Sequence, residues 1–125
     1  MIRLLVESYL LLLHVEMLLK VRNLRAIYDL VLRQSIAKPL RMGESSIEAI
    51  CHAMDLACAL YVKPVECLQR SAATTVLLKR LGWEAKLVIG AQVLPFKAHA
   101  WTEVGGCVVN DKPSVTGLYT VLDRC

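Results

Sequence analysis

Apolar residues dominate the first third of the chain and recur on almost every side of a helical projection of residues 3–33. Strong helix formers fill this stretch, so we predict a helical segment that breaks near Val21–Leu24. A helix that is apolar nearly all round has to be covered nearly all round. A small domain offers limited interior for this purpose, and we therefore expect part of the leucine surface to contact another protein.

A predicted loop followed by a helix-capping motif marks the start of the next helix. Residues Ser35–Gly43 contain Pro39 and predict a loop, after which Ser45 and Glu48 form a capping box. Apolar residues then follow at helical spacing and predict a buried helix over residues 46–61. Pro64 ends it.

The rest of the chain turns from helix to strand. A further helix is predicted to start near Glu66. It should end at Gly82, because glycine suits the left-handed position after a helix. Beyond it the segments are short, β-branched or aromatic, and separated by Pro95 and a Gly-Gly pair. They predict an antiparallel meander with a weaker fourth strand: Lys86–Ala91, Lys97–Val104, Cys107–Asp111 and Leu118–Leu122. Helices first and strands second indicate the α+β class.

Composition limits the classes of protein that remain. The chain has 125 residues, a length that excludes a multidomain assembly, and 56% of them are apolar, a fraction that excludes a disordered tail. Its net charge is +4. Residues 1–43 carry seven basic and three acidic side chains, whereas residues 44–125 carry eight of each. Without aromatic interleaving or a basic stripe elsewhere, a nucleic-acid target is not expected. An acidic partner or an anionic lipid surface remains open.

This charge asymmetry divides the chain into two predicted parts. Residues 1–43 form a leucine-rich basic helical region, and residues 44–125 form the core domain. We interpret the first part as core plus a surface for a partner. The alternative is an amphipathic membrane-surface anchor that uses Lys20, Arg22 and Arg25, although its leucines leave no clear polar face.

The cysteines and the N-terminus predict a cytoplasmic protein. The five cysteines form an odd set without C-x-x-C spacing, which disfavours a disulfide framework and a zinc knuckle. A reducing compartment fits this pattern. Glu7 and Glu16 interrupt the first apolar run, so we expect neither a signal peptide nor a membrane span.

Three residues form a candidate catalytic set. Cys67 stands at a predicted helix start, His99 within a strand, and Asp111 at the end of the next strand. These are the parts of a nucleophile, base and orienter system. The positive end of the helix dipole and the unpaired N–H groups there favour the thiolate and could hold an oxyanion.

The alternation of side chains along paired strands tests whether His99 and Asp111 can lie on the same face of the sheet. A two-residue turn at Gly105-Gly106 would pair Ala100 with Asp111 and leave His99 on the other face, unless a bulge intervened. A three-residue connection that includes Val104 pairs His99 with Asp111 instead. We therefore predict the three-residue connection, with His99 and Asp111 on one face of the sheet.

The same residues resemble a known family, the lasso peptide leader peptidases of the transglutaminase-like cysteine protease superfamily. The resemblance covers roughly residues 63–111, and its specificity lies in the order of a cysteine, A-H-A-W and V-V-N-D. The segments that carry it are Cys67–Ala72, Leu87–Gly90, Pro95–Val104 and Val108–Asp111.

The resemblance implies a papain-like or transglutaminase-like core in which Cys67 is the nucleophile, His99 the general base and acid, and Asp111 the orienter. Members remove the leader from a ribosomally made precursor peptide, and a separate cyclase then closes the freed α-amine of the core into a macrolactam. No metal or cofactor is required for this chemistry. The chain is similar to the peptidase half of a split pair, which implies a separate leader-recognition protein.

Further residues and alternatives remain open. Trp101 is interpreted as a wall of the site, Arg70 as a solvated base or a substrate contact, and Gln92 as a possible oxyanion donor. The other cysteines are expected to be inert, and His14 and His52 to be structural. The rival functions are acyl transfer to an amine through the same thioester, and an interaction module of this fold that has lost activity.

Overall fold

The computed structural model describes residues 2–36 and 46–125 of the chain. Helices come first and strands follow, which confirms the predicted α+β class. The elements in chain order are α1 (Ile2–Val21), α2 (Leu24–Arg33), α3 (Ile47–Leu60), α4 (Cys67–Arg80), β1 (Ala85–Gln92), β2 (Lys97–Val104), β3 (Cys107–Val108), α5 (Val115–Leu118) and β4 (Thr120–Arg124).

The N-terminal helical segment breaks where the sequence predicted. Asn23 adopts an extended backbone between α1 and α2, and its side-chain oxygen accepts a hydrogen bond from the N–H of Ala26. This cap starts α2 as a separate helix, because a side-chain acceptor satisfies one of the N–H groups that a helix start leaves unpaired. Ser46 caps α3 in the same way. The predicted capping residue Ser45 and most of the predicted 35–43 loop lie outside the described residues.

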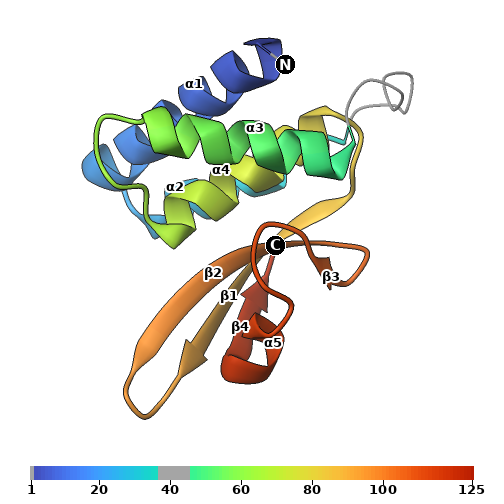
Figure 1. Cartoon of the computed structure of the whole chain (residues 1–125). Helices are drawn as coiled ribbons and strands as arrows, with labels where there is room; N and C mark the ends of the chain where they lie inside the picture. Colours follow the sequence, from blue (N-terminus) through green and yellow to red (C-terminus); the bar gives the residue numbers. More distant parts are fainter. Residues whose placement is uncertain (1, 37–45) are drawn as a thin grey trace.

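All four long helices lie on one face of the sheet (Figure 1). Helix α4 is the central one, and its residues from Ser71 to Lys79 are buried between β1–β2 and the other helices. Helix α1 contributes Leu11, Leu12 and Val15 to this same core. The two parts predicted as 1–43 and 44–125 therefore share one hydrophobic core as far as the described residues go, and the domain division stays a prediction.

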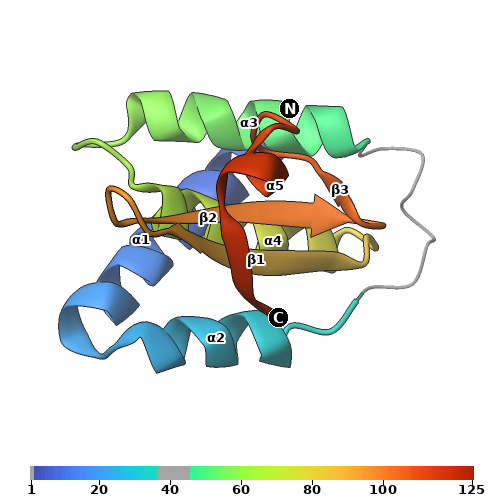
Figure 2. The same cartoon turned by 90° about the horizontal axis from the view of Figure 1, so that it is seen from below.

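The sheet differs from the predicted meander. Its strand order is β3-β2-β1-β4, so the fourth strand pairs antiparallel with β1 at the far edge rather than with β3. The short helix α5 makes this crossover possible by carrying the chain across the open face of the sheet (Figure 2). A second, smaller cluster of Val88, Trp101 and Val115 is buried on that face.

The predicted three-residue connection between β2 and β3 is wrong. Val104 pairs with Cys107 across a two-residue turn, in which Gly105 and Gly106 have φ values of 60° and 80°. Two successive residues in the left-handed region are the requirement of the tight hairpin turn that matches strand twist, and glycine adopts them without a steric cost. The third strand is also shorter than the predicted Cys107–Asp111, because it ends at Val108.

Helix α1 keeps an apolar stripe in contact with solvent. Its members recur at spacings of three and four residues and are between 39% and 79% exposed: Ile2, Val6, Leu10, Leu13, Met17 and Val21. This spacing is that of a helix seam that packs against a partner. None of the helices in the described parts of the chain is long and apolar enough to cross a membrane.

Candidate active site

The structure brings together the predicted base and the predicted orienter. The imidazole Nε2 of His99 lies 2.6 Å from Oδ2 of Asp111, and both side chains are largely but not fully buried. Such a short contact to a carboxylate is typical of a charge-assisted hydrogen bond. The predicted placement on one side of the sheet is therefore confirmed, although by a route other than the predicted turn.

The second ring nitrogen of His99 is left open. Nδ1 has no hydrogen-bond partner within residues 2–36 and 46–125. In the same residues every side-chain nitrogen or oxygen that is buried has a partner, so an atom without a partner is not buried. Nδ1 is therefore open to solvent. With Asp111 accepting a hydrogen bond from Nε2–H, the neutral ring presents Nδ1 as its basic atom.

Asp111 reaches His99 because the chain leaves the strand register just before it. The N–H of Val109 still donates to the carbonyl of Thr102, as a continued strand requires. The N–H of Thr102, however, donates to the side-chain oxygen of Asn110 at 2.8 Å instead of to the carbonyl of Val109. This departure is the bulge-like irregularity that a two-residue turn needs if Asp111 is to share a face with His99.

The predicted nucleophile stands at the first position of α4. Glu66 precedes it as the N-cap but makes no side-chain capping bond, so this residue leaves the first backbone N–H groups of the helix uncapped. Cys67 is half-buried and packs against the hydrophobic core. The N–H groups at such a helix start can stabilise an oxyanion.

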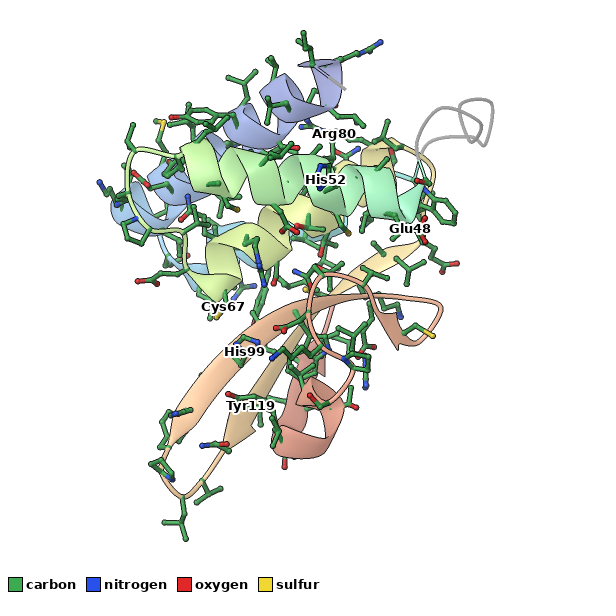
Figure 3. All side chains as sticks on the ribbon, viewed as in Figure 1. Glu48, His52, Cys67, Arg80, His99 and Tyr119 are labelled. Atoms are coloured by element: carbon green, nitrogen blue, oxygen red, sulfur yellow. The ribbon has the colours of Figure 1, made fainter. Side chains whose placement is uncertain are left out.

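Polar contacts from the next turn of α4 fix this helix end against β2. Ser71, one helical turn after Cys67, donates to the carbonyl of Ala100 at 3.0 Å. Ala100 is the neighbour of His99 in β2. Figure 3 shows Cys67 at the end of α4 that points toward the sheet, with His99 on the strand below it.

No hydrogen bond joins Sγ of Cys67 to the His99 ring in the described part of the chain. Catalytic contacts are often long without substrate and tighten when it binds. The arrangement therefore supplies two formed parts of the set, the His99–Asp111 pair and the cysteine at the start of α4.

Aromatic side chains hold the imidazole in place. The ring of Tyr119 stacks on His99 with centroids 5.2 Å apart, and the Trp101 ring lies 6.1 Å away on the same face of β2. Trp101 is 0% exposed, and its Nε1 donates to the carboxylate of Glu103. Complete burial leaves Trp101 no surface for a substrate and makes it a support for the His99 ring.

Arg70 connects the nucleophile helix to the Asp111 loop. Its guanidinium donates to the carbonyl of Asn110 at 3.1 Å and lies 3.8 Å from the carboxylate of Asp55. These contacts give Arg70 a structural task, and its remaining exposed surface keeps the substrate role a prediction. Gln92 lies at the β1–β2 hairpin, where its amide nitrogen donates to the carbonyl of Pro95. Its predicted oxyanion role is likewise untested.

The pKa of the Asp111 carboxyl lies below its ordinary value of 3.8. Burial by itself raises this pKa, but the hydrogen bonds from His99 and from the Lys112 N–H outweigh it, together with the nearby charges of His99 and Arg70. Asp111 is therefore ionised at neutral pH. An ionised carboxylate can orient the imidazole and stabilise the imidazolium that forms during proton transfer.

Most of the other cysteines are poor nucleophiles. Burial, followed by the carboxylates of Asp55 and Glu48, raises the pKa of the Cys51 thiol to about 11. Burial also raises the pKa values of Cys58 and Cys125. Because thiolate is the reactive form, these three thiols are suppressed at neutral pH. Cys107 is exposed at the β2–β3 hairpin.

Sequence reasoning missed three residues around the site: Ser71, Asn110 and Tyr119. Their contacts join segments that are far apart in the sequence, so periodicity gives no sign of them. The only local signal is that Asn110 directly precedes the orienter. No cluster of three potential metal ligands occurs among the described residues.

Comparison with known proteins places the chain in a family. It is 40% identical over 57 residues to the microcin J25-processing protein McjB of Escherichia coli, a match that spans 46% of this chain and 27% of that protein. The matched region is thus about a quarter of the relative's length. No solved structure matches. The family described as the transglutaminase-like superfamily matches residues 9–124, nearly the whole chain. The protein therefore belongs to the transglutaminase-like superfamily.

Proposed function

We propose that this protein is a cytoplasmic cysteine peptidase that removes the leader from a lasso peptide precursor. The observation that carries the proposal is the 2.6 Å contact between His99 and Asp111, formed beside a helix that begins with Cys67. The similarity to a microcin-processing protein supports the choice of substrate, and membership of the transglutaminase-like superfamily supports the use of a cysteine.

In this mechanism the open Nδ1 of His99 takes the proton of the Cys67 thiol. The thiolate attacks the carbonyl carbon of the last leader residue, and the free N–H groups at the start of α4 stabilise the tetrahedral oxyanion. His99 then protonates the departing amine, which leaves a thioester on Cys67. A water molecule, deprotonated by His99, hydrolyses this thioester and restores the thiol.

Replacing Cys67 with alanine tests the proposal directly. A precursor peptide is incubated with the purified protein and its leader-recognition partner, and the products are identified by mass spectrometry. We expect the wild type to release leader and core by hydrolysis, and Cys67→Ala to leave the precursor intact, because the variant lacks the only nucleophile in the mechanism. Cys107→Ala, which changes an exposed thiol away from His99, should cleave normally.

The products also distinguish the rival activity. Hydrolysis adds the mass of one water across the two fragments. Acyl transfer instead joins the leader to an added amine and incorporates no water. Cleavage that persists in Cys67→Ala refutes the cysteine mechanism. An intact precursor in the cognate wild-type reaction supports the inactive interaction module.

We further propose that the exposed stripe of α1 binds the leader-recognition protein, while a separate cyclase acts on the released core. The apolar spacing supports a protein partner over a lipid surface. Changing Leu10 and Met17 to glutamate should abolish complex formation in isothermal titration calorimetry without unfolding the protein, since both positions are exposed. Leu60→Glu, a change at a similarly exposed position on α3, serves as the control. If Leu60→Glu weakened complex formation as much as the α1 variant, the α1 stripe would not be the specific binding surface.

A further inference from the structure

The contacts around Asn110 go beyond what the candidate catalytic set requires. Its side-chain oxygen accepts from the N–H of Thr102 in β2 at 2.8 Å, and its side-chain nitrogen donates to the hydroxyl of Ser71 in α4 at 3.0 Å. Its own carbonyl accepts from Arg70 in α4. One residue thus joins the base-bearing strand, the nucleophile-bearing helix and the loop that ends at the orienter.

The oxygen of Asn110 replaces a backbone partner. In a strand that continued the observed Glu103–Val108 register, Thr102 would pair with Val109, and Ala100 would oppose Asp111. Asp111 would then lie on the helix-facing side of the sheet, away from His99. Because Asn110 supplies the acceptor for the N–H of Thr102, the chain can leave the register without an unpaired backbone group at this point.

The nitrogen of Asn110 links this loop to α4, the helix that begins with Cys67. It donates to Ser71 Oγ, which in turn donates to the carbonyl of Ala100, next to His99. Thr102 closes the same network, since its hydroxyl donates to the carbonyl of Ser71. Ser71 lies one turn after Cys67, so the network fixes the start of α4 relative to both His99 and Asp111.

We propose that Asn110 is a positioning residue, which places the Asp111 carboxylate on the His99 ring and holds the pair at a fixed distance from Cys67. It acts through Asp111 and Ser71 and does not touch the substrate. This inference rests on the proposed function for its catalytic consequence, whereas the placement of Asp111 can be measured without any substrate.

The placement is tested on the imidazole itself. In the Cys67→Ala background at pH 8, the ¹⁵N chemical shifts of His99 report which ring nitrogen carries the proton. We expect a single tautomer with the proton on Nε2, held by Asp111. Asn110→Ala should give a mixture of tautomers, and Asp111→Asn is expected to do the same. An unchanged single tautomer in Asn110→Ala would overturn the proposal.

The catalytic consequence is tested with the precursor assay. Asn110→Ala should lower kcat roughly 10- to 100-fold with KM changed by less than about twofold, because misplacement of a catalytic group costs rate rather than binding. The matched control is Lys79→Met, which removes another buried bond between α4 and a backbone carbonyl, that of Val31, at the far end of the helix. It should lose stability but keep kcat and the His99 tautomer.

The double variant Ser71→Ala/Asn110→Ala shows whether the two residues act together. If Asn110 acts through Ser71, the double variant loses little more activity than Asn110→Ala alone. Fully additive losses would exclude this link. If the wild type fails to cleave the precursor, the proposed function fails, but the ¹⁵N shifts still decide the role of Asn110.

Discussion

At the residue scale, the site depends on one ionised carboxylate held against an imidazole. The low pKa of Asp111 means that folding favours its charged form, through the hydrogen bonds of His99 and Lys112 and despite burial. A carboxyl with a lowered pKa stabilises the fold above its ordinary value of 3.8, and this contribution is lost as the pH falls through the lower value in the folded state. The sequence identified both partners, but could not show this contact.

The free energy of unfolding should therefore fall at acidic pH as Asp111 becomes protonated. Urea unfolding of the wild type and of Asp111→Asn, measured at intervals from pH 5 to pH 2, should converge as the pH falls. The wild type loses its Asp111 contribution in this range, whereas the variant has none to lose. Two curves that remain parallel down to pH 2 would show that Asp111 is not stabilised by its partners.

At the element scale, the β2–β3 hairpin and the crossover to β4 decide the site. The sequence predicted the correct strand segments for β1 and β2, because alternation and punctuating residues are local signals. It gave the wrong turn length, since parity alone assumed that β3 stays in register to Asp111. The side chain of Asn110 breaks that register. The pairing of β4 with β1 was also missed, because edge pairing is a long-range choice.

Gly90 shows how closely these strands pack behind His99. It pairs with His99 across β1 and β2, and a Cβ at this position would lie 2.7 Å from the Trp101 ring and 2.9 Å from Cβ of Tyr119. Gly90→Ala should lower the free energy of unfolding by about 1–3 kcal/mol, as overpacking of a filled core does. Urea titration measures this loss.

Gly117→Ala is the matched control for that change, because a Cβ there meets nothing within 4 Å. We expect its free energy of unfolding to stay within about 0.5 kcal/mol of the wild type. If Gly90→Ala were equally neutral, the tight contact of Trp101 and Tyr119 behind the His99 ring would be refuted.

At the scale of the whole molecule, one core supports the site. Leu11, Leu12 and Val15 of α1 and Ile27 and Val31 of α2 are buried together with the apolar side of α4. The helix that carries Cys67 is thus covered by the N-terminal helices on one side and by the sheet on the other. Its position depends on both.

A chain of residues 44–125 should therefore not fold alone. Removal of α1 and α2 exposes the buried face of α4, including Leu77 and Leu78, to water. We expect little dispersion in its amide NMR spectrum and no cooperative thermal transition, in contrast to the full chain. A cooperative transition of the truncated chain would instead confirm the predicted boundary at residue 43.

The sequence by itself predicted most of the helix and strand segments, the three residues of the candidate catalytic set, and the excess of apolar surface on α1. These features are encoded by neighbours in the chain: periodicity, caps, glycine turns and short motifs. Only the tertiary structure decided the strand order, the departure of Asn110 from the register and the stacking of Tyr119 on His99. Each of these depends on contacts between residues distant in sequence, whose energies exist only once the chain is packed.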